Sequence, residues 1–354
     1  MSDLKTTRVV VVDDSLTIRN LLTRQLSAFS DIEVVGSAED ALTAQRQIAR
    51  HRPDVITLDI EMPGKDGLEL LKNLMEQHPL PVVMVSAHTG PGADATLRAL
   101  ELGAVDYMAK PSGTSCSTES YYRQLADKIR VAASARLQTP AHTNPSQDKS
   151  ADPPPCLPAR NRLKIIAIGA STGGTEAIRY LLGRLPTALP PIVITQHMPA
   201  GFTQSFADRL DQTSKLSVTE ATQGQELEPG HAYIAPGDGH LKIEHRADHH
   251  LVCQIDRGAK VHNHMPSVDV LFDSVVEAVG NRSMGIILTG MGSDGATGLL
   301  RMRNQGCHTI GQDKNSCVIY GMPRAAELAG AVVEQLPLQQ IADQILSPPS
   351  IKTA

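Results

Sequence analysis

Short apolar runs alternate with amphipathic segments over the first 130 residues of the chain. Short runs are typical of buried strands, whereas the longer segments carry apolar residues at the three-to-four-residue spacing of helices. Strands are predicted at residues 8–12, 33–37, 55–58, 82–85 and 106–108. Helices are predicted at residues 15–28, 41–50, 67–77 and 93–102. This order indicates a parallel sheet covered on both faces, so we expect a five-stranded, doubly wound, flavodoxin-like α/β domain.

A proline-rich segment without aliphatic runs follows this domain. Residues 138–160 read QTPAHTNPSQDKSADPPPCLPAR. Such a segment cannot bury enough apolar area to offset the cost of ordering its backbone. We therefore predict a first domain at residues 5–130, a linker at 131–162 and a second domain at 163–350.

The α/β pattern returns after the linker. Strands are predicted at residues 164–168, 192–195 and 284–288, and helices at 176–182, 202–210 and 268–279. The stretch from residue 232 to 253 contains three short apolar segments, YIAP, LKIEH and LVCQI, the last of which runs on to residue 255. Turn residues separate them, so we predict a β-hairpin appended to the sheet. We expect a second doubly wound parallel sheet, in a Rossmann-like three-layer domain.

Composition supports this fold class and excludes several functions. Hydrophobic residues make up 41% of the chain but aromatic residues only 3%, so aliphatic side chains must form the cores. The net charge is -5 and no run of Lys or Arg occurs, which argues against a nucleic-acid partner. No apolar stretch approaches the roughly 20 residues that cross a bilayer. The N-terminus lacks a signal-peptide pattern, so we expect a cytoplasmic, monomeric protein that is not a membrane protein.

The cysteines are odd in number and irregularly spaced, which suits reduced thiols better than a disulfide framework or a zinc site. They are Cys116, Cys156, Cys253, Cys307 and Cys317.

Three aspartates stand at strand ends of the first predicted sheet. Asp13 and Asp14 follow the first strand, and Asp59 follows the third. Because the carboxyl ends of parallel strands meet at one crevice, we expect the three carboxylates to converge. Carboxylates so placed need a cation, and oxygen-only ligands favour Mg²⁺. The alternative is that Asp13 and Asp14 only cap the helix that begins near Ser15.

A hydroxyl and an ammonium group are predicted at the same edge of the sheet. Ser86 ends the fourth strand and Lys110 follows the fifth, so both are expected to reach the oxygens of a phosphoryl group on Asp59. This joint placement favours a phosphoacceptor site over simple helix capping. The Lys110–Pro111 bond is a candidate for the cis form, although trans is the default.

The first domain resembles the receiver domain of two-component response regulators. The motifs that carry the resemblance are VVVDDS, ITLDIEMPGKDG, VVMVSA and GAVDYMAKP. The resemblance implies that Asp59 is the phosphoacceptor, and that Asp13, Asp14 and the Glu61 carbonyl hold Mg²⁺. It also implies that Ser86 and Lys110 sense the phosphoryl group and that Tyr107 is a switching aromatic residue.

The second domain contains a candidate nucleophile. The segment GASTGG at residues 169–174 lies between a predicted strand and a predicted helix, and it fits the G-x-S-x-G pattern in which Ser171 projects from a tight turn. The alternatives are a structural glycine-rich turn or a phosphate-binding loop. A nucleotide-binding domain is disfavoured because the chain lacks both G-x-x-x-x-G-K-[ST] and G-x-G-x-x-G.

A serine nucleophile needs a base and a carboxylate that orients this base. His197 directly follows a predicted strand in PIVITQH, and Asp294 lies just beyond another in MGIILTGMGSDG. Their order along the chain, Ser, His and Asp, differs from that of α/β-hydrolases. The glycines around Met291 favour close approach of backbone amides to an oxyanion, although they also suit a plain turn. We predict that Ser171, His197 and Asp294 form a triad.

The second domain resembles the catalytic domain of chemotaxis protein-glutamate methylesterases. The resemblance rests on the motifs above together with QHMPAGFTQSFADRL, IAPGDGHLKI, HMPSVDVLF and CVIYGMPRAA. It implies hydrolysis of glutamate methyl esters on methyl-accepting chemotaxis receptors, release of methanol, and deamidation of receptor glutamines, without a cofactor for the esterase. Thr172 and Met291 lie where members of the family line the oxyanion site.

The order of receiver, linker and esterase implies control by a chemotaxis histidine kinase. We expect the unphosphorylated receiver to cover the cleft at Ser171, and phosphorylation to shift Ser86 and Tyr107 and expose it. A non-enzymatic adaptor is the rival interpretation. The remaining histidines offer no standard zinc spacing, so we interpret them as solvated loop residues. They include His245, His249, His250, His262 and His264.

Overall fold

The chain forms two compact units, Met1–His142 and Thr143–Ala354, in the computed structural model. The structure describes residues 6–62, 67–86, 90–110, 118–135, 137, 163–246 and 250–347. Most of the predicted linker, the Lys110–Pro111 bond, Cys116, Cys156 and His249 lie outside these residues.

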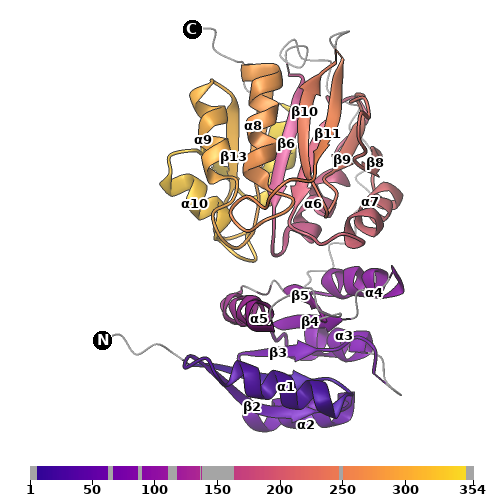
Figure 1. The fold of residues 1–354 in the computed structure, drawn as a ribbon, viewed down its shortest axis with the longest axis vertical. Coiled ribbons are helices and arrows are strands. Elements are labelled where there is room, and N and C mark those ends of the chain that lie inside the picture. Colours follow the sequence, from indigo (N-terminus) through magenta and orange to yellow (C-terminus); the bar gives the residue numbers. More distant parts are fainter. Residues whose placement is uncertain are drawn as a thin grey trace. The chain divides into compact units, whose positions relative to one another are not determined.

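The first unit contains a five-stranded sheet with the order β2-β1-β3-β4-β5, in which every pair of neighbours is parallel (Figure 1). Its strands are β1 (Thr7–Val12), β2 (Ile32–Ala38), β3 (Val55–Leu58), β4 (Val82–Ser86) and β5 (Asp106–Ala109). Its helices are α1 (Leu16–Leu26), α2 (Ala41–His51), α3 (Gly67–Gln77), α4 (Gly90–Glu101) and α5 (Thr118–Ala133). The predicted flavodoxin-like fold is confirmed, and the order places the ends of β1 and β3 side by side at a switch point.

Helix α5 is absent from the helices predicted above. Its buried face is made by two adjacent tyrosines, Tyr121 and Tyr122, and by aliphatic residues that include two small alanines: Leu125, Ala126, Ile129 and Ala132. This mixture of aromatic and small residues hides the aliphatic periodicity on which the prediction relies.

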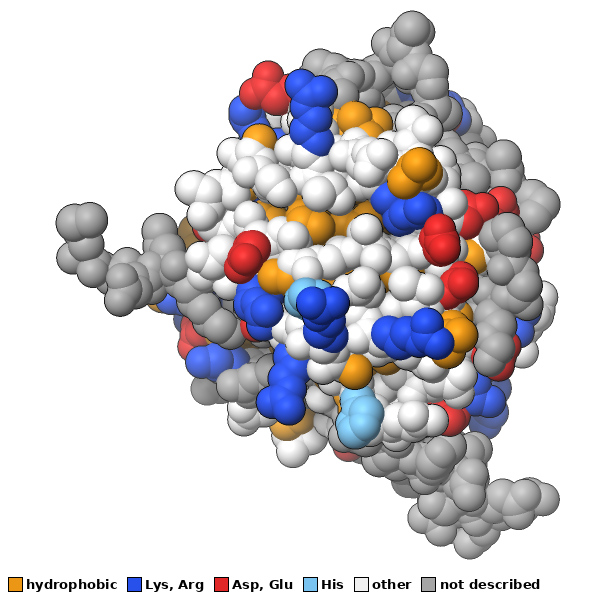
Figure 2. Space-filling view, turned by 90° about the horizontal axis from the view of Figure 1, so that it is seen from below, with side chains coloured by type: hydrophobic (Ala, Val, Ile, Leu, Met, Phe, Trp, Pro, Cys, Tyr) orange, Lys and Arg blue, Asp and Glu red, His pale blue; other side chains and the backbone are white. Residues whose placement is uncertain are grey.

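Basic residues stand in the last turns of the helices α1 and α2. Arg24 stands in the last turn of α1, and Arg50 and His51 stand in the last turn of α2. The negative end of the backbone dipole favours cations there. Figure 2 shows Lys and Arg side chains spread over the surface seen from below, with acidic side chains among them.

The second unit is built on a seven-stranded parallel sheet with the order β14-β13-β12-β6-β7-β9-β8 (Figure 1). Its strands are β6 (Ile165–Ala170), β7 (Ile192–Gln196), β8 (Ser217–Glu220), β9 (His231–Ile234), β12 (Ser283–Ile287), β13 (His308–Gln312) and β14 (Glu334–Leu336). Its helices are α6 (Gly174–Leu182), α7 (Phe202–Thr213), α8 (Val268–Val279), α9 (Ala296–Asn304), α10 (Met322–Leu328) and α11 (Leu338–Leu346). Helix α6 packs against α7, and α9 packs against α8 and α10. Right-handed crossovers would place these two groups on opposite faces of the parallel sheet, in agreement with the predicted three-layer α/β class.

The predicted hairpin differs from its expected position. The strands β10 (His240–His245) and β11 (Leu251–Asp256) do pair antiparallel, but they form a separate two-stranded sheet. The segment YIAP, grouped with them above, instead supplies β9, which pairs in parallel with β7 and β8. The buried residues Leu241, Ile243 and Cys253 explain the difference, because they pack the hairpin into the core that also contains the apolar side of α8.

The three cysteines within the described residues are free thiols, as the sequence predicts, and all three are buried. Burial raises the pKa of the Cys253 thiol to about 12, and burial with the nearby Asp313 raises that of Cys317 to about 12. These thiols are therefore protonated and unreactive at neutral pH. No helix among the described residues has both the length and the apolar character for crossing a membrane.

His308 on β13 makes the stability of the second unit sensitive to acid. Burial lowers the pKa of His308, and the nearby Glu334 opposes this only in part. The unfolded state therefore binds a proton more readily than the folded state, so stability is lost as the pH falls through about 6.5. We expect His308→Gln to lose less unfolding free energy than the wild type between pH 7 and pH 5. Denaturant unfolding at several pH values measures this difference, and equal slopes for both proteins would contradict it.

Candidate active site

Ser171 and His197 occupy equivalent positions on neighbouring strands of the large sheet. Ala170 at the end of β6 pairs with Gln196 at the end of β7, and the next residues in the chain are Ser171 and His197. The His197 amide donates to the Ala170 carbonyl (3.1 Å), which keeps the two strands in register up to the site. The sheet therefore brings the predicted nucleophile and the predicted base together at its carboxyl edge.

The turn that carries Ser171 is fixed by backbone contacts from three directions. The Ser171 amide donates to the Thr289 carbonyl (3.1 Å), and the Ser171 carbonyl accepts from the Gly174 amide (2.7 Å) and from Gln196 Nε2 (2.9 Å). Gly290 packs directly against the serine, since a Cβ atom on Gly290 would lie 2.8 Å from the Ser171 Cβ. The loop after β12 can approach Ser171 this closely only because a glycine stands there.

Asp294, from the same loop, is paired with His197. The distance between His197 Nε2 and Asp294 Oδ2 is 2.8 Å, and the exposed fractions of the two side chains are 9% and 0%. The other ring nitrogen, His197 Nδ1, is buried and accepts no hydrogen bond from any described residue. The pairing through Nε2 makes Nδ1 the nitrogen that remains for Ser171.

The carboxylate of Asp294 sits at the N-terminus of helix α8. Beside His197, three groups from the start of α8 donate hydrogen bonds to it, so both of its oxygens are satisfied twice. They are Ser267 Oγ (2.8 Å), the Val268 amide (2.7 Å) and the Asp269 amide (3.2 Å). Burial alone would raise the pKa of Asp294, but the hydrogen bond from His197 Nε2 and those from the α8 donors hold it well below its ordinary value. Asp294 is therefore an anion at neutral pH, as a helix N-terminus favours.

The N-terminus of α8 must lie close to β6 for its groups to reach Asp294, and a glycine in β6 makes this approach possible. A Cβ atom on Gly169 would lie 2.2 Å from the Val268 Cγ1, so only glycine fits beside the first residue of the helix. Ser267 is the N-cap of α8, yet its hydroxyl donates to Asp294 instead of accepting from the helix. The sequence reasoning above does not identify Ser267 or Gln196, because both act on the triad through contacts between distant segments.

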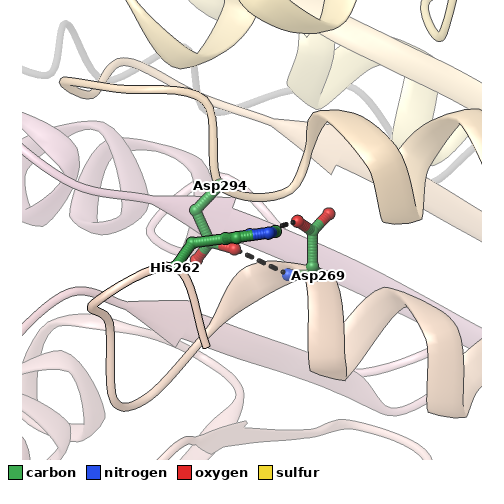
Figure 3. Close-up of side chains that lie close together, drawn as sticks. All are labelled: His262, Asp269 and Asp294. Atoms are coloured by element: carbon green, nitrogen blue, oxygen red, sulfur yellow. Dashed lines mark hydrogen bonds and ion pairs between the residues drawn. The ribbon is translucent and has the colours of Figure 1, made fainter. Parts of the chain in front are cut away.

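Asp294 is also part of a cluster with His262 and Asp269, drawn in Figure 3. One ligand atom from each of these three residues lies within 4.8 Å of the others. A metal ion does not fit here, because four donors already fill the acceptor sites of Asp294. Within the cluster, His262 Nδ1 lies 3.3 Å from Asp269 Oδ2. Burial raises the pKa of Asp269, and His262 and the Gly298 amide partly offset this.

Of the remaining histidines that we interpret as solvated, His245, His250 and His262 are exposed, whereas His264 is half-buried. The ring of His264 stacks on the ring of His197, with 3.9 Å between centroids and 7° between planes. His262 pairs with Asp269, His250 pairs with Glu226, and His245 Nε2 lies 2.9 Å from the Ala278 carbonyl. The spacing of these histidines along the chain gives no hint of partners that only the fold brings near.

The two predicted oxyanion residues lie next to Ser171. Thr172 follows it in the turn and is buried, whereas Met291 follows Gly290, whose backbone packs against the serine. Their amides remain the predicted oxyanion donors.

The predicted acidic residues of the first unit also come together. Ligand atoms of Asp13, Asp14 and Asp59 lie within 4.8 Å of one another, with Asp13 and Asp59 buried and Asp14 exposed. Lys110 Nζ lies 2.7 Å from Asp59 Oδ2 and 2.9 Å from Asp13 Oδ2. Ser15, rather than either aspartate, is the N-cap of α1, which argues against the capping alternative.

Charge and burial compete at this acidic cluster. Burial raises the pKa of Asp59, and the Lys110 ammonium offsets this only in part. Burial would lower the pKa of Lys110, but its pairs with Asp59 and Asp13 raise it instead, so the ammonium is charged at neutral pH. Ser86 and Tyr107 are both buried on neighbouring strands, and the Ser86 hydroxyl has no hydrogen-bond partner among the described residues.

The acidic cluster fits Mg²⁺. All three side chains offer carboxylate oxygens, which are the ligands that Mg²⁺ prefers, and their ligand atoms lie close enough together to share one ion.

The fold and the two sites define a class of protein: a doubly wound receiver-type unit joined to an α/β unit with a Ser, His and Asp at the carboxyl edge of its sheet. Comparison with known families agrees with this class. Residues 9–118 match the response regulator receiver domain, and residues 166–345 match the CheB methylesterase family. The chain belongs to the CheB methylesterase family.

Curated relatives match nearly the full length of the chain. A protein-glutamate methylesterase/protein-glutamine glutaminase of Chromohalobacter salexigens is 50% identical over 94% of both chains. The protein of the same name from Escherichia coli strain K12 is 48% identical over 96% of both chains. The crystal structure of the Thermotoga maritima CheB methylesterase catalytic domain is 39% identical, with a TM-score of 0.51, and covers 52% of this chain and 97% of that one.

Proposed function

We propose that the second unit is a serine hydrolase that removes methyl esters from glutamate side chains of methyl-accepting chemotaxis receptors and deamidates receptor glutamines. The observation that carries the proposal is the hydrogen bond between His197 and the anionic Asp294. His197 follows β7 and Ser171 follows the neighbouring strand β6, so this pair lies beside the serine. The names of the full-length relatives supply the substrate class.

In the proposed reaction Ser171 Oγ attacks the ester carbonyl while His197 Nδ1 takes its proton. Asp294 holds the ring through Nε2 and stabilises the imidazolium that forms. The amides of Thr172 and Met291 donate to the oxyanion. Collapse of the intermediate breaks the bond to the methoxy oxygen, which leaves as methanol with the proton from His197. Water then attacks the acyl-enzyme in the same way and releases the glutamate carboxylate.

Methanol release from methylated receptors tests the proposal. The full chain, incubated with receptor carrying radiolabelled methyl esters, is expected to release volatile label over many turnovers. A non-enzymatic adaptor would bind the receptor without releasing methanol, and a nucleotide-binding domain would do neither. Mass spectrometry of receptor glutamines in the same reaction measures deamidation.

For the first unit we propose that Asp59 accepts a phosphoryl group from a chemotaxis histidine kinase. Asp13 and Asp14, with Asp59 itself and the Glu61 carbonyl, would hold a Mg²⁺ ion, which supplies neutralising charge for the transferred phosphoryl group. Lys110 already contacts the Asp59 oxygen and is placed to bind a phosphoryl oxygen, and Ser86 offers a hydroxyl without a partner among the described residues. Tyr107 is proposed as the switching aromatic residue, and phosphorylation is proposed to activate the hydrolase.

Asp59→Asn is expected to abolish labelling by a radiolabelled phosphodonor in the presence of Mg²⁺, because the amide is not a phosphoacceptor. The variant should keep the methanol release of the unphosphorylated wild type and lose the increase that the phosphodonor produces. Asp127→Asn is the matched control, since Asp127 is a surface carboxylate paired with Arg130. Full labelling of Asp59→Asn would place the phosphoacceptor elsewhere.

We also propose that the functional boundaries are those predicted from the sequence, with a receiver at residues 5–130, a linker at 131–162 and an esterase at 163–350. The protein is proposed to act as a monomer. It is proposed to work in the cytoplasm, where its receptor and kinase partners would reach it.

A further inference from the structure

A second imidazole lies flat on the predicted catalytic base. The His264 ring is stacked on His197 with its centroid 3.9 Å away and its plane tilted by only 7°. His264 precedes helix α8 and is 67 residues beyond His197 in the sequence (264 minus 197). The mechanism above assigns no task to it.

His197 needs more than one restraint to hold its ring. The hydrogen bond from Nε2 to Asp294 fixes one atom of the ring. The terminal torsion of a histidine is broad, so the ring can still turn about the direction of this bond and carry Nδ1 away from the serine. A flat ring in van der Waals contact opposes such a rotation, because any tilt of His197 drives its edge into its neighbour.

The turn before α8 is built to hold His264 firmly. The Val261 amide donates to the His264 carbonyl (3.1 Å), and the His264 amide donates to the Val261 carbonyl (2.9 Å), which closes a two-residue turn. His262 and Asn263 between them have φ angles of 50° and 66°, the left-handed pair of a type I′ turn. A two-residue turn closed at both ends leaves its flanking residue little freedom.

His262 ties this turn to the same helix end that holds Asp294. Its Nδ1 lies 3.3 Å from Asp269 Oδ2, and the Asp269 amide donates to Asp294. Both contacts are drawn in Figure 3. The start of α8 therefore fixes both the hydrogen-bond partner of His197 and the turn that presents its stacking partner.

We propose that His264 is a positioning residue that keeps the plane of His197 aligned for proton transfer with Ser171. It acts through ring contact with His197 and takes no proton itself. This inference rests on the proposed esterase function and adds a residue to it.

Replacement of the His264 ring distinguishes a positioning role from a structural or substrate-binding role. His264→Ala removes the contact and is expected to lower kcat by about 10- to 100-fold with KM changed by less than about 2-fold, since small misplacements of a catalytic group have effects of this size. His264→Phe keeps a flat ring and is expected to retain kcat within about 3-fold of wild type. His231→Ala, at the half-buried first position of β9, is the control and should match wild type.

Three outcomes would overturn the positioning role. They are equal losses in the Ala and Phe variants, an Ala variant with normal kcat, and an Ala variant in which only KM rises. Thermal unfolding of each variant checks that it is folded. If the Ala variant is unfolded, His264→Leu replaces it in the comparison with His264→Phe, because leucine keeps a bulky side chain but has no ring. Wild-type methanol release is measured first. Its absence would refute the proposed function, whereas release with the wrong pattern among variants refutes only the role of His264.

Discussion

Ser171→Ala is expected to reduce methanol release by about 10⁶-fold, the size of the effect when the nucleophile of a serine hydrolase is lost. The side chain is small and the turn is held by backbone bonds of Ser171 to Thr289 and Gly174, so the fold should be retained. Binding of receptor should also persist, because the change removes only a hydroxyl.

The measurement is label release from methylated receptor, with receptor binding measured in parallel. Ser217→Ala, at an exposed position on the edge strand β8, is the control and should release methanol at the wild-type rate. Unchanged release by Ser171→Ala would remove the serine from the mechanism.

Asp294→Asn is expected to lower kcat by about 10⁴-fold, as loss of the orienting carboxylate does in other triads. The amide nitrogen of an asparagine cannot accept the hydrogen bond from His197 Nε2, so the ring would lose the tautomer that leaves Nδ1 free to take the proton of Ser171. Asp273→Asn, on the same helix region but paired with Arg301, is the matched control. A loss of less than about 10-fold in Asp294→Asn would contradict the assigned role.

The same change should also destabilise the second unit in a pH-dependent way. The pKa of Asp294 is held below its unfolded value, so its stabilising contribution is complete above about pH 4 and is lost as the pH falls through the folded pKa. The difference in unfolding free energy between Asp294→Asn and wild type should therefore be largest at neutral pH and shrink in strong acid.

The fold class could be predicted because its strands are short, uninterrupted apolar runs that are buried on both faces. Runs of consecutive aliphatic residues, such as VVVV in β1 and IIAI in β6, are typical of parallel strands that are covered by helices on both faces. The hairpin was misplaced because YIAP and LKIEH look alike as short strands. Their pairing depends on which buried surfaces they cover, and the local sequence does not contain that information.

In the candidate active site, too, some residues could be predicted from the sequence and others could not. Ser171, His197 and Asp294 follow strands directly or by a short loop, so a parallel sheet gathers them at one edge and the sequence suffices to group them. The residues that hold them come from elsewhere: Ser267 precedes α8, and His264 sits on a tight turn. A histidine in a loop has no periodicity, and its partner becomes visible only when β11, α8 and β7 are placed together in space.

Active-site labelling tests the central claim most directly. The intact chain is treated with a fluorophosphonate, digested, and mapped by mass spectrometry, with Ser171→Ala treated alongside. The account predicts one modified peptide with the label on Ser171, and no labelled peptide from the variant. A label on another serine, or methanol release by wild type that persists without any label on Ser171, would contradict it.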